Sequence, residues 1–224
     1  MKKFIQTTLQ TLLNSLDTDF DKNELAYLSS QGKNELQIRD KIAWRLHNIL
    51  NAEYGEDTPY VVRREWAPVG SGREKVDLAI LEMDSAKTTI IRVIALIEFK
   101  AQSIARPEKW YIKEFQRDVA KMRKLKQEKA ICNDADLYFV FLETGQECKA
   151  DKYQSVLGYA IYQNGKMAYH QDTNYLSAIT EHWSEFANAL GEPITIHTPK
   201  AIYIGEAFGY KQYVSPLLIG PIEI

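Results

Sequence analysis

The chain has 224 residues, of which 45% are hydrophobic and 11% aromatic, and this composition excludes an intrinsically disordered protein. No stretch reaches the roughly 18 apolar residues of a membrane span, and polar residues interrupt the N-terminal segment where a signal peptide needs an apolar region. The net charge of −2 and the pI near 6.1 exclude a protein that binds nucleic acid with its whole surface. We expect one cytoplasmic domain without membrane contact.

The first third of the chain predicts helices followed by a strand. Residues 4–16 carry apolar side chains at helical spacing. A second, longer helix begins after Asn34, which forms a predicted capping box with Gln37. The buried stripe predicted for this helix consists of Leu36, Ala43, Leu46 and Leu50. Glu35 lies in its first turn, where the helix macrodipole favours a carboxylate for structural reasons alone. Residues 59–66 then predict a first strand.

Residues 76–100 predict two strands joined by a polar turn. Side chains on a strand alternate between its faces, so Asp77 points away from the face that carries Val76 and Leu78. In the second strand Glu98 and Lys100 share one face. The opposite face is predicted to carry Ile91, Val93, Ala95, Ile97 and Phe99, and the remaining Ile94 and Leu96 to lie with Glu98. The second strand is therefore apolar on both faces until its end, which is typical of a central strand.

A hairpin of these two strands brings Asp77 beside Glu98 and Lys100. Two carboxylates that meet at one place in a sheet repel each other and raise each other's pKa unless a cation lies between them. Hard oxygen ligands of this kind suit Mg²⁺. The sequence therefore predicts a magnesium site, with an alternative placement that uses Asp84 in the turn in place of Asp77.

A basic helix is predicted to follow this pair of strands. Residues 106–129 contain nine basic and four acidic residues, a local charge of +5. An apolar stripe of Tyr111, Phe115, Val119, Met122 and Leu125 predicts the buried side of the helix. Its basic side would lie where a phosphate backbone approaches the metal site, although charged helix faces are often simply solvated. The residues we expect to contact nucleic acid are Lys113, Gln116, Arg117, Lys121 and Lys124.

The rest of the chain predicts a further buried strand and a smaller unit. Residues 136–142 form a continuous apolar run. Asn164-Gly165 between two apolar segments predicts a hairpin, residues 175–190 predict a helix, and residues 194–204 predict a strand. We expect a helical extension at residues 1–32, a core at residues 33–143 and a C-terminal hairpin-helix-strand unit at residues 144–224.

Asp77 followed by Glu98-Phe99-Lys100 resembles the signature of the PD-(D/E)XK superfamily of restriction-endonuclease-like nucleases. Val76 stands at the position of the proline that names the family. The resemblance implies an α/β fold whose core is a helix, a three-stranded antiparallel meander, a helix and a strand. The N-terminal helices and the C-terminal α+β unit would be embellishments of this core.

The resemblance also implies roles for individual residues. Asp77, Glu98 and the backbone carbonyl of Phe99 would bind Mg²⁺, for which Mn²⁺ would substitute, and Lys100 would orient the attacking water and offset negative charge. An acidic residue on the helix before the meander points into the metal site in this family, and Glu35 is in the matching place, with its macrodipole role as the alternative. Gln116 matches a polar residue of the helix that follows.

Two functions agree with these residues. The first is a magnesium-dependent endonuclease that hydrolyses DNA, with RNA not excluded, in restriction, phage defence or DNA processing, and with a homodimer as one arrangement. The second is a catalytically silent nucleic-acid-binding or scaffolding subunit of the same fold, in which Asp77, Glu98 and Lys100 form only structural ion pairs.

Overall fold

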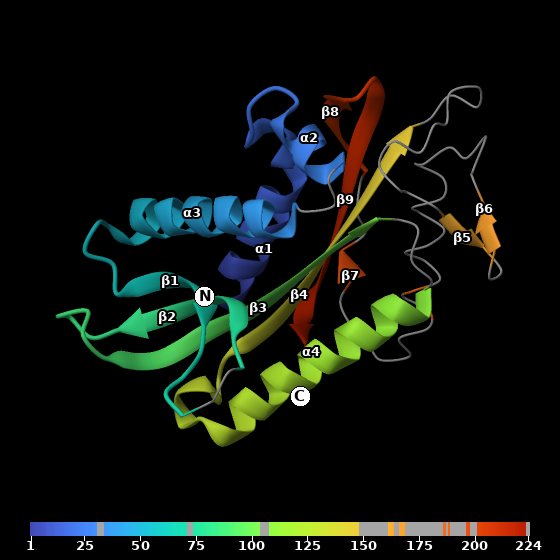
Figure 1. The fold of residues 1–224 in the computed structure, drawn as a ribbon. Coiled ribbons are helices and arrows are strands. Elements are labelled where there is room, and N and C mark those ends of the chain that lie inside the picture. Colours follow the sequence, from blue (N-terminus) through green and yellow to red (C-terminus); the bar gives the residue numbers. More distant parts are fainter. Residues whose placement is uncertain are drawn as a thin grey trace.

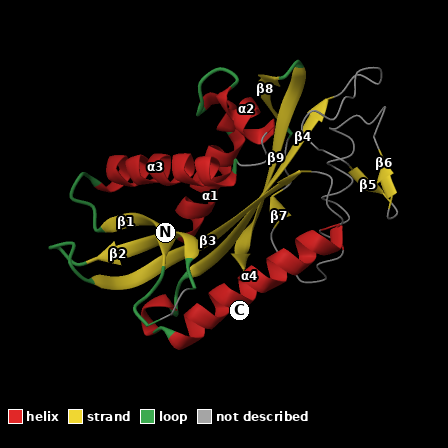
Figure 2. Cartoon of the chain, viewed as in Figure 1, coloured by secondary structure: helices red, strands yellow, loops and turns green. Residues whose placement is uncertain are grey.

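The computed structural model describes residues 1–30, 34–70, 74–103, 108–147, 161–163, 166–168, 186, 188, 196–197 and 201–222, and its centre is a seven-stranded sheet (Figures 1 and 2). Six strands follow in the order β1-β2-β3-β4-β9-β7, and β8 pairs with β9. Their bounds are β1 Tyr60–Trp66, β2 Val76–Met83, β3 Ile90–Ser103, β4 Asp136–Glu147, β7 Ile196–His197, β8 Ile202–Ala207 and β9 Tyr210–Ile222. Only β3 and β4 are parallel; the other neighbours are antiparallel.

Helices cover both faces of this sheet. Three helices, α1 (Lys2–Asn14), α2 (Glu24–Ser30) and α3 (Glu35–Tyr54), pack on one face, and α4 (Glu108–Glu128) packs on the other (Figure 1). Short 3-10 turns, η1 (Leu16–Thr18) and η2 (Ala130–Cys132), follow α1 and α4. The strands β3 and β4 are parallel, so the chain must cross over between them, and α4 lies in this connection. The mixed α/β class predicted from the sequence is confirmed. Among the described residues, no helix is long and apolar enough to cross a membrane.

The predicted stripe of α4 is confirmed, but that of α3 was wrong in one position. Tyr111, Phe115, Val119, Met122 and Leu125 are all buried. In α3 the buried residues are Ile38, Arg39, Ile42, Ala43, Leu46 and Leu50, whereas Leu36 is 52% exposed. Leu36 precedes Ile38 by two residues, which is about 200° around a helix, so both cannot face the sheet.

The predicted capping box at the start of α3 is absent. The Asn34 side chain makes no bond to the helix and instead donates to Ser29 Oγ at 2.9 Å. This bond joins the start of α3 to the end of α2. At its other end α3 stops at Gly55, whose φ of 89° lies in a region that glycine adopts most easily.

Two predictions for β3 need correction. A β-bulge lies opposite Ile80 and Leu81, which pair with Ala95 and Val93. The extra residue reverses the alternation of side chains in the part of β3 before Ala95. Val93 therefore packs on the α4 side of the sheet and Ile94 on the α3 side, and Ile91 is exposed. The alternation predicted from Ala95 onward is unchanged. The strand also continues to Ser103, so Glu98 and Lys100 lie within it and not at its end.

The C-terminal predictions are confirmed only where residues are described. The strands β5 (Ile161–Gln163) and β6 (Lys166–Ala168) form the expected antiparallel pair. Within residues 194–204, where one strand was predicted, the structure describes residues 196–197, which form β7, and residues 201–204, which contain the start of β8. Most of the helix predicted for residues 175–190 lies outside the described residues.

Candidate functional site

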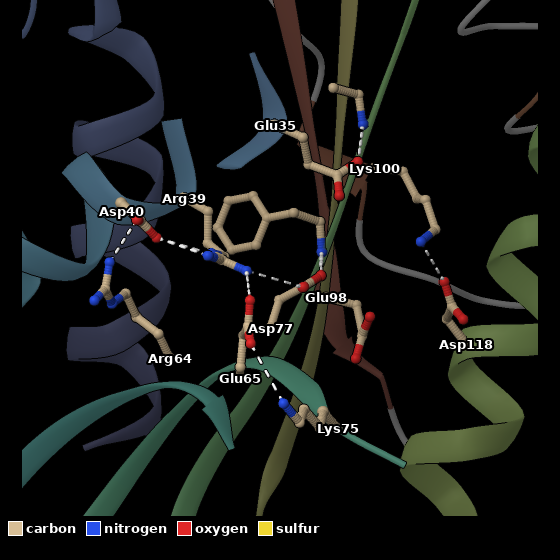
Figure 3. A network of polar contacts seen from close by, with 12 residues as sticks. Glu35, Arg39, Asp40, Arg64, Glu65, Lys75, Asp77, Glu98, Lys100 and Asp118 are labelled. Atoms are coloured by element: carbon tan, nitrogen blue, oxygen red, sulfur yellow. Dashed lines mark hydrogen bonds and ion pairs between the residues drawn. The ribbon is translucent and has the colours of Figure 1, made fainter. Parts of the chain in front are cut away.

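The pairing of β2 with β3 places Asp77 beside Glu98 and Phe99. The antiparallel register sets Leu78 opposite Ile97, which puts Asp77 opposite Glu98 at the beginning of β2. Asp77 Oδ2 accepts a hydrogen bond from the Phe99 backbone N–H at 2.8 Å (Figure 3). The Asp77 side chain keeps 20% of its surface exposed. The sequence prediction that these residues meet in one hairpin is therefore confirmed.

Glu98 is a buried carboxylate with one close cationic partner. Its residue surface is 3% exposed, and Oε1 lies 2.5 Å from Lys121 Nζ. Burial raises the pKa of Glu98 to about 8, and the negative charge of Asp77 contributes in the same direction against the opposing effect of Lys121. At neutral pH this carboxyl group is therefore mostly protonated in the metal-free protein.

Lys100 points from β3 toward α4. Its Nζ lies 3.2 Å from Asp118 Oδ2 (Figure 3). Burial lowers the pKa of Lys100, but the attraction of Asp118 and Glu35 outweighs burial, so the pKa lies above its ordinary value. The side chain is 21% exposed. Lys100 is thus a charged ammonium group with some access to solvent.

Glu35 reaches β3 from the opposite helical layer. Its Oε2 accepts a hydrogen bond from the Ala101 backbone N–H at 2.7 Å (Figure 3). Burial raises the pKa of Glu35, and Asp77 adds to this effect, whereas Ala101, Lys100 and Arg39 lower it. Glu35 therefore belongs to the same electrostatic cluster as Asp77 and Lys100, in addition to its place in the first turn of α3.

Arg39 is a member of this cluster that the sequence analysis missed. Its side chain is 6% exposed and lies 3.6 Å from Asp77, 3.4 Å from Glu65 and 2.9 Å from Asp40 (Figure 3). It follows Glu35 by four residues and so lies on the same helix face. An arginine among the buried positions of α3 was the signal that could have identified it.

Three of the five predicted nucleic-acid-binding residues on α4 contact acidic or backbone groups of the protein. Lys121 donates to the Lys75 carbonyl at 2.8 Å, and Lys124 lies 3.3 Å from Glu74, so both contact the segment that leads into β2. Arg117 pairs with Glu114 at 2.5 Å and with Asp118 at 3.2 Å. The other two predicted residues, Lys113 and Gln116, are exposed. The nucleic-acid role of all five stays a prediction.

Asp118 is a second residue that the sequence analysis missed. It is 4% exposed and lies between Phe115 and Met122 in the buried stripe of α4. The spacing itself carried the signal, because position 118 follows 115 by three residues and precedes 122 by four. An acidic residue in an apolar stripe requires a nearby cation, and in this fold Lys100 and Arg117 both pair with Asp118.

The alternative placement with Asp84 is not supported by the geometry. Asp84 lies in the turn between β2 and β3, where its carboxylate accepts the backbone N–H groups of Thr88 at 2.7 Å and Thr89 at 3.1 Å. The pKa of Asp84 is lowered, first by its bonds to Thr89 and Thr88. Its role is that of a turn-forming residue, at the end of the hairpin remote from Asp77.

Within the described part of the chain, no group of three or more His, Cys, Asp or Glu side chains is arranged to hold a metal ion. Comparisons with family models, curated proteins and solved structures gave no match.

Proposed function

We propose that this protein is a magnesium-dependent endonuclease that hydrolyses DNA phosphodiester bonds, on a restriction-endonuclease-like core of the PD-(D/E)XK type. One observation carries the proposal: the β2–β3 pairing sets Asp77 opposite Glu98, with Lys100 two residues further along the same strand, and Asp77 accepts a hydrogen bond from the Phe99 backbone. These three residue types in this order are the ones that the resemblance names.

The order of elements gives independent support. A helix (α3), an antiparallel meander (β1, β2 and β3), a second helix (α4) and a strand parallel to the last of the meander (β4) follow one another. This is the order that the resemblance implies for the core. The remaining helices α1 and α2 and the strand β9 extend the helical layer and the sheet around it.

The donor set fits a magnesium ion. Magnesium is usually bound in proteins by one or two carboxylates, with water and substrate phosphate as further ligands, so it does not need three protein side chains. Asp77, Glu98 and the Phe99 carbonyl would supply such a set of hard oxygens. The raised pKa of Glu98, caused by burial and then by Asp77, describes a carboxylate that lacks sufficient positive charge in the metal-free protein. Manganese, which accepts the same ligands, would substitute.

Each residue then has a defined task. Bound magnesium would activate a water molecule and neutralise charge on the phosphoryl group. Asp77 and Glu98 would hold the ion, and the protonated Lys100 would stabilise the negative charge that develops on the phosphoryl oxygens. Glu35 fixes α3 to β3 through Ala101, and its closeness to Asp77 and Lys100 supports a contact with the ion or its water. The exposed Lys113 and Gln116 on α4 would face the phosphate backbone.

A second function is favoured by a different observation. Both proposed ligands already have basic neighbours, Arg39 for Asp77 and Lys121 for Glu98. These pairs give both carboxylates a structural role that needs no metal. This favours, as the alternative, a catalytically silent protein that binds nucleic acid or acts as a scaffold.

A cleavage assay separates the two functions. We expect the purified wild type to cut supercoiled plasmid DNA with millimolar magnesium or manganese and to leave it intact with a chelator. Linear duplex, single-stranded DNA and RNA in parallel would define the substrate. The supercoiled plasmid has no ends, so its conversion to nicked circles or linear DNA identifies an endonuclease and excludes an exonuclease. Retarded migration of the DNA without cutting, under every metal condition, would support the silent alternative.

A further inference from the structure

Two ion pairs connect β3 to α4 at the candidate site. Glu98 and Lys100 lie two residues apart on one face of β3, and Asp118 and Lys121 lie three residues apart on α4. Glu98 pairs with Lys121 and Lys100 pairs with Asp118, the order expected for a strand and a helix that run in opposite directions. The two spacings, about 6.6 Å along a strand and about 4.5 Å along a helix, are close enough for both pairs to form together.

Asp118 forms an ion pair with Lys100 and is more buried than Lys100 itself. Its side chain is 5% exposed, compared with 21% for Lys100. A buried carboxylate is stable only when it is paired, so its position in the apolar stripe commits it to the Lys100 ammonium and to Arg117 Nε, 3.2 Å away. The lysine stem has four rotatable bonds, and a fixed partner is needed to hold its end in one place.

We propose that Asp118 is the positioning residue of Lys100 and directs its ammonium group toward the phosphoryl site beside Glu98. This inference rests on the proposed nuclease function, because only a reaction at that site requires an aimed ammonium group. Asp118 itself touches neither substrate nor metal.

Kinetics of Asp118→Asn test the inference. The amide keeps the size of the carboxylate but loses the charge that holds Lys100. We expect kcat for magnesium-dependent DNA cleavage to fall about a hundredfold, the scale on which a displacement of about 1 Å slows a reaction. The KM should stay within about twofold of the wild-type value, because the lost interaction is made in the transition state and does not contribute to substrate binding.

Glu114→Gln is the matched control. Glu114 lies one turn earlier on α4 and pairs with Arg117, whose side chain is 56% exposed. The substitution removes the same charge from the same helix without touching Lys100, and it should leave kcat unchanged. Asp118→Leu is a second variant if Asp118→Asn does not fold, since leucine suits a position between Phe115 and Met122. It should show the same loss of kcat.

NMR spectroscopy reports whether the Lys100 ammonium group is held in place in the absence of metal and substrate. In ¹⁵N-labelled, metal-free protein we expect a slowly exchanging side-chain ammonium signal for Lys100, assigned by its absence in Lys100→Met. The signal should disappear in Asp118→Asn and persist in Glu114→Gln. Persistence of the signal in Asp118→Asn would overturn the inference, whether or not the protein cleaves DNA.

The two proposals fail in different ways. If Lys100→Met is inactive but Asp118→Asn keeps the kcat of the wild type, the positioning role is wrong and the nuclease function stands. If the wild type cleaves no substrate, the nuclease function fails, and the proposed purpose of the Lys100–Asp118 pair fails with it even where the ammonium signal behaves as expected.

Discussion

Glu98→Gln should make the metal-free protein more stable than the wild type at about pH 9, and the two proteins should be similar at about pH 5. The folded-state pKa of Glu98, about 8, lies above the ordinary value of 4.5. The folded protein therefore binds more protons than the unfolded chain between these values, and stability is lost as the pH rises toward 8. Glutamine keeps the size and an acceptor oxygen for Lys121 but has no charge to bury.

The expected difference is large. Each pKa unit corresponds to about 1.4 kcal/mol, so the free energy of unfolding should differ by up to several kcal/mol at the alkaline end. Urea unfolding in a chelating buffer across this pH range measures it. Glu82→Gln, which removes a charge paired with Arg92 in the same hairpin, is the control and should not reproduce the rise. A wild type that stays the more stable protein at about pH 9 would contradict the burial cost assigned to Glu98.

Lys100→Met should lower kcat for DNA cleavage by roughly a thousandfold or more, since it removes a charge aimed at the transition state. Lys100→Arg should be almost as inactive, because a planar guanidinium cannot take the place of a compact ammonium beside Asp118. DNA binding should remain, because the binding surface proposed on α4 is unchanged.

Lys87→Met provides the control for loss of a lysine. Lys87 lies in the turn between β2 and β3, at the end of the hairpin remote from Asp77, and its substitution should leave kcat unchanged. Circular dichroism would verify that Lys100→Met is folded, since Asp118 retains Arg117 as a partner. Activity of Lys100→Met equal to that of Lys87→Met would remove Lys100 from the mechanism.

Local pattern was sufficient to predict the part of the site that depends on neighbouring residues in one hairpin. The alternation from Ala95 to Lys100 placed Glu98 and Lys100 on one face, and the turn at Asp84 brought Asp77 opposite Glu98. The stripe of α4 was equally clear from its spacing. These features follow from periodicities of 2 and 3.6 residues, which the sequence displays directly.

Features that depend on packing between distant elements were not predicted. The bulge near Val93 shifts the faces of β3 upstream of the site, and nothing in an apolar run marks it. Lys121 was expected on the exposed, nucleic-acid-binding side of α4, but its ammonium group reaches Glu98, because lysine can extend a long stem from the margin of a buried face. Arg39 and Asp118 were visible as charges in apolar stripes, yet their partners come from other elements, which only the fold brings near.

If Asp77 and Glu98 together hold a divalent cation, a thermal-shift titration detects its binding without any substrate. A ligand that binds only the folded state adds about 2.7 kcal/mol of stability at a hundredfold excess over its Kd. For a protein of this size that corresponds to a rise in Tm of roughly 5 to 11 °C. Magnesium or manganese should therefore raise the Tm of the wild type, and the rise should be lost in Asp77→Asn and in Glu98→Gln. An equal metal-dependent rise in the wild type and in both variants would place the cation elsewhere and exclude Asp77 and Glu98 as its ligands.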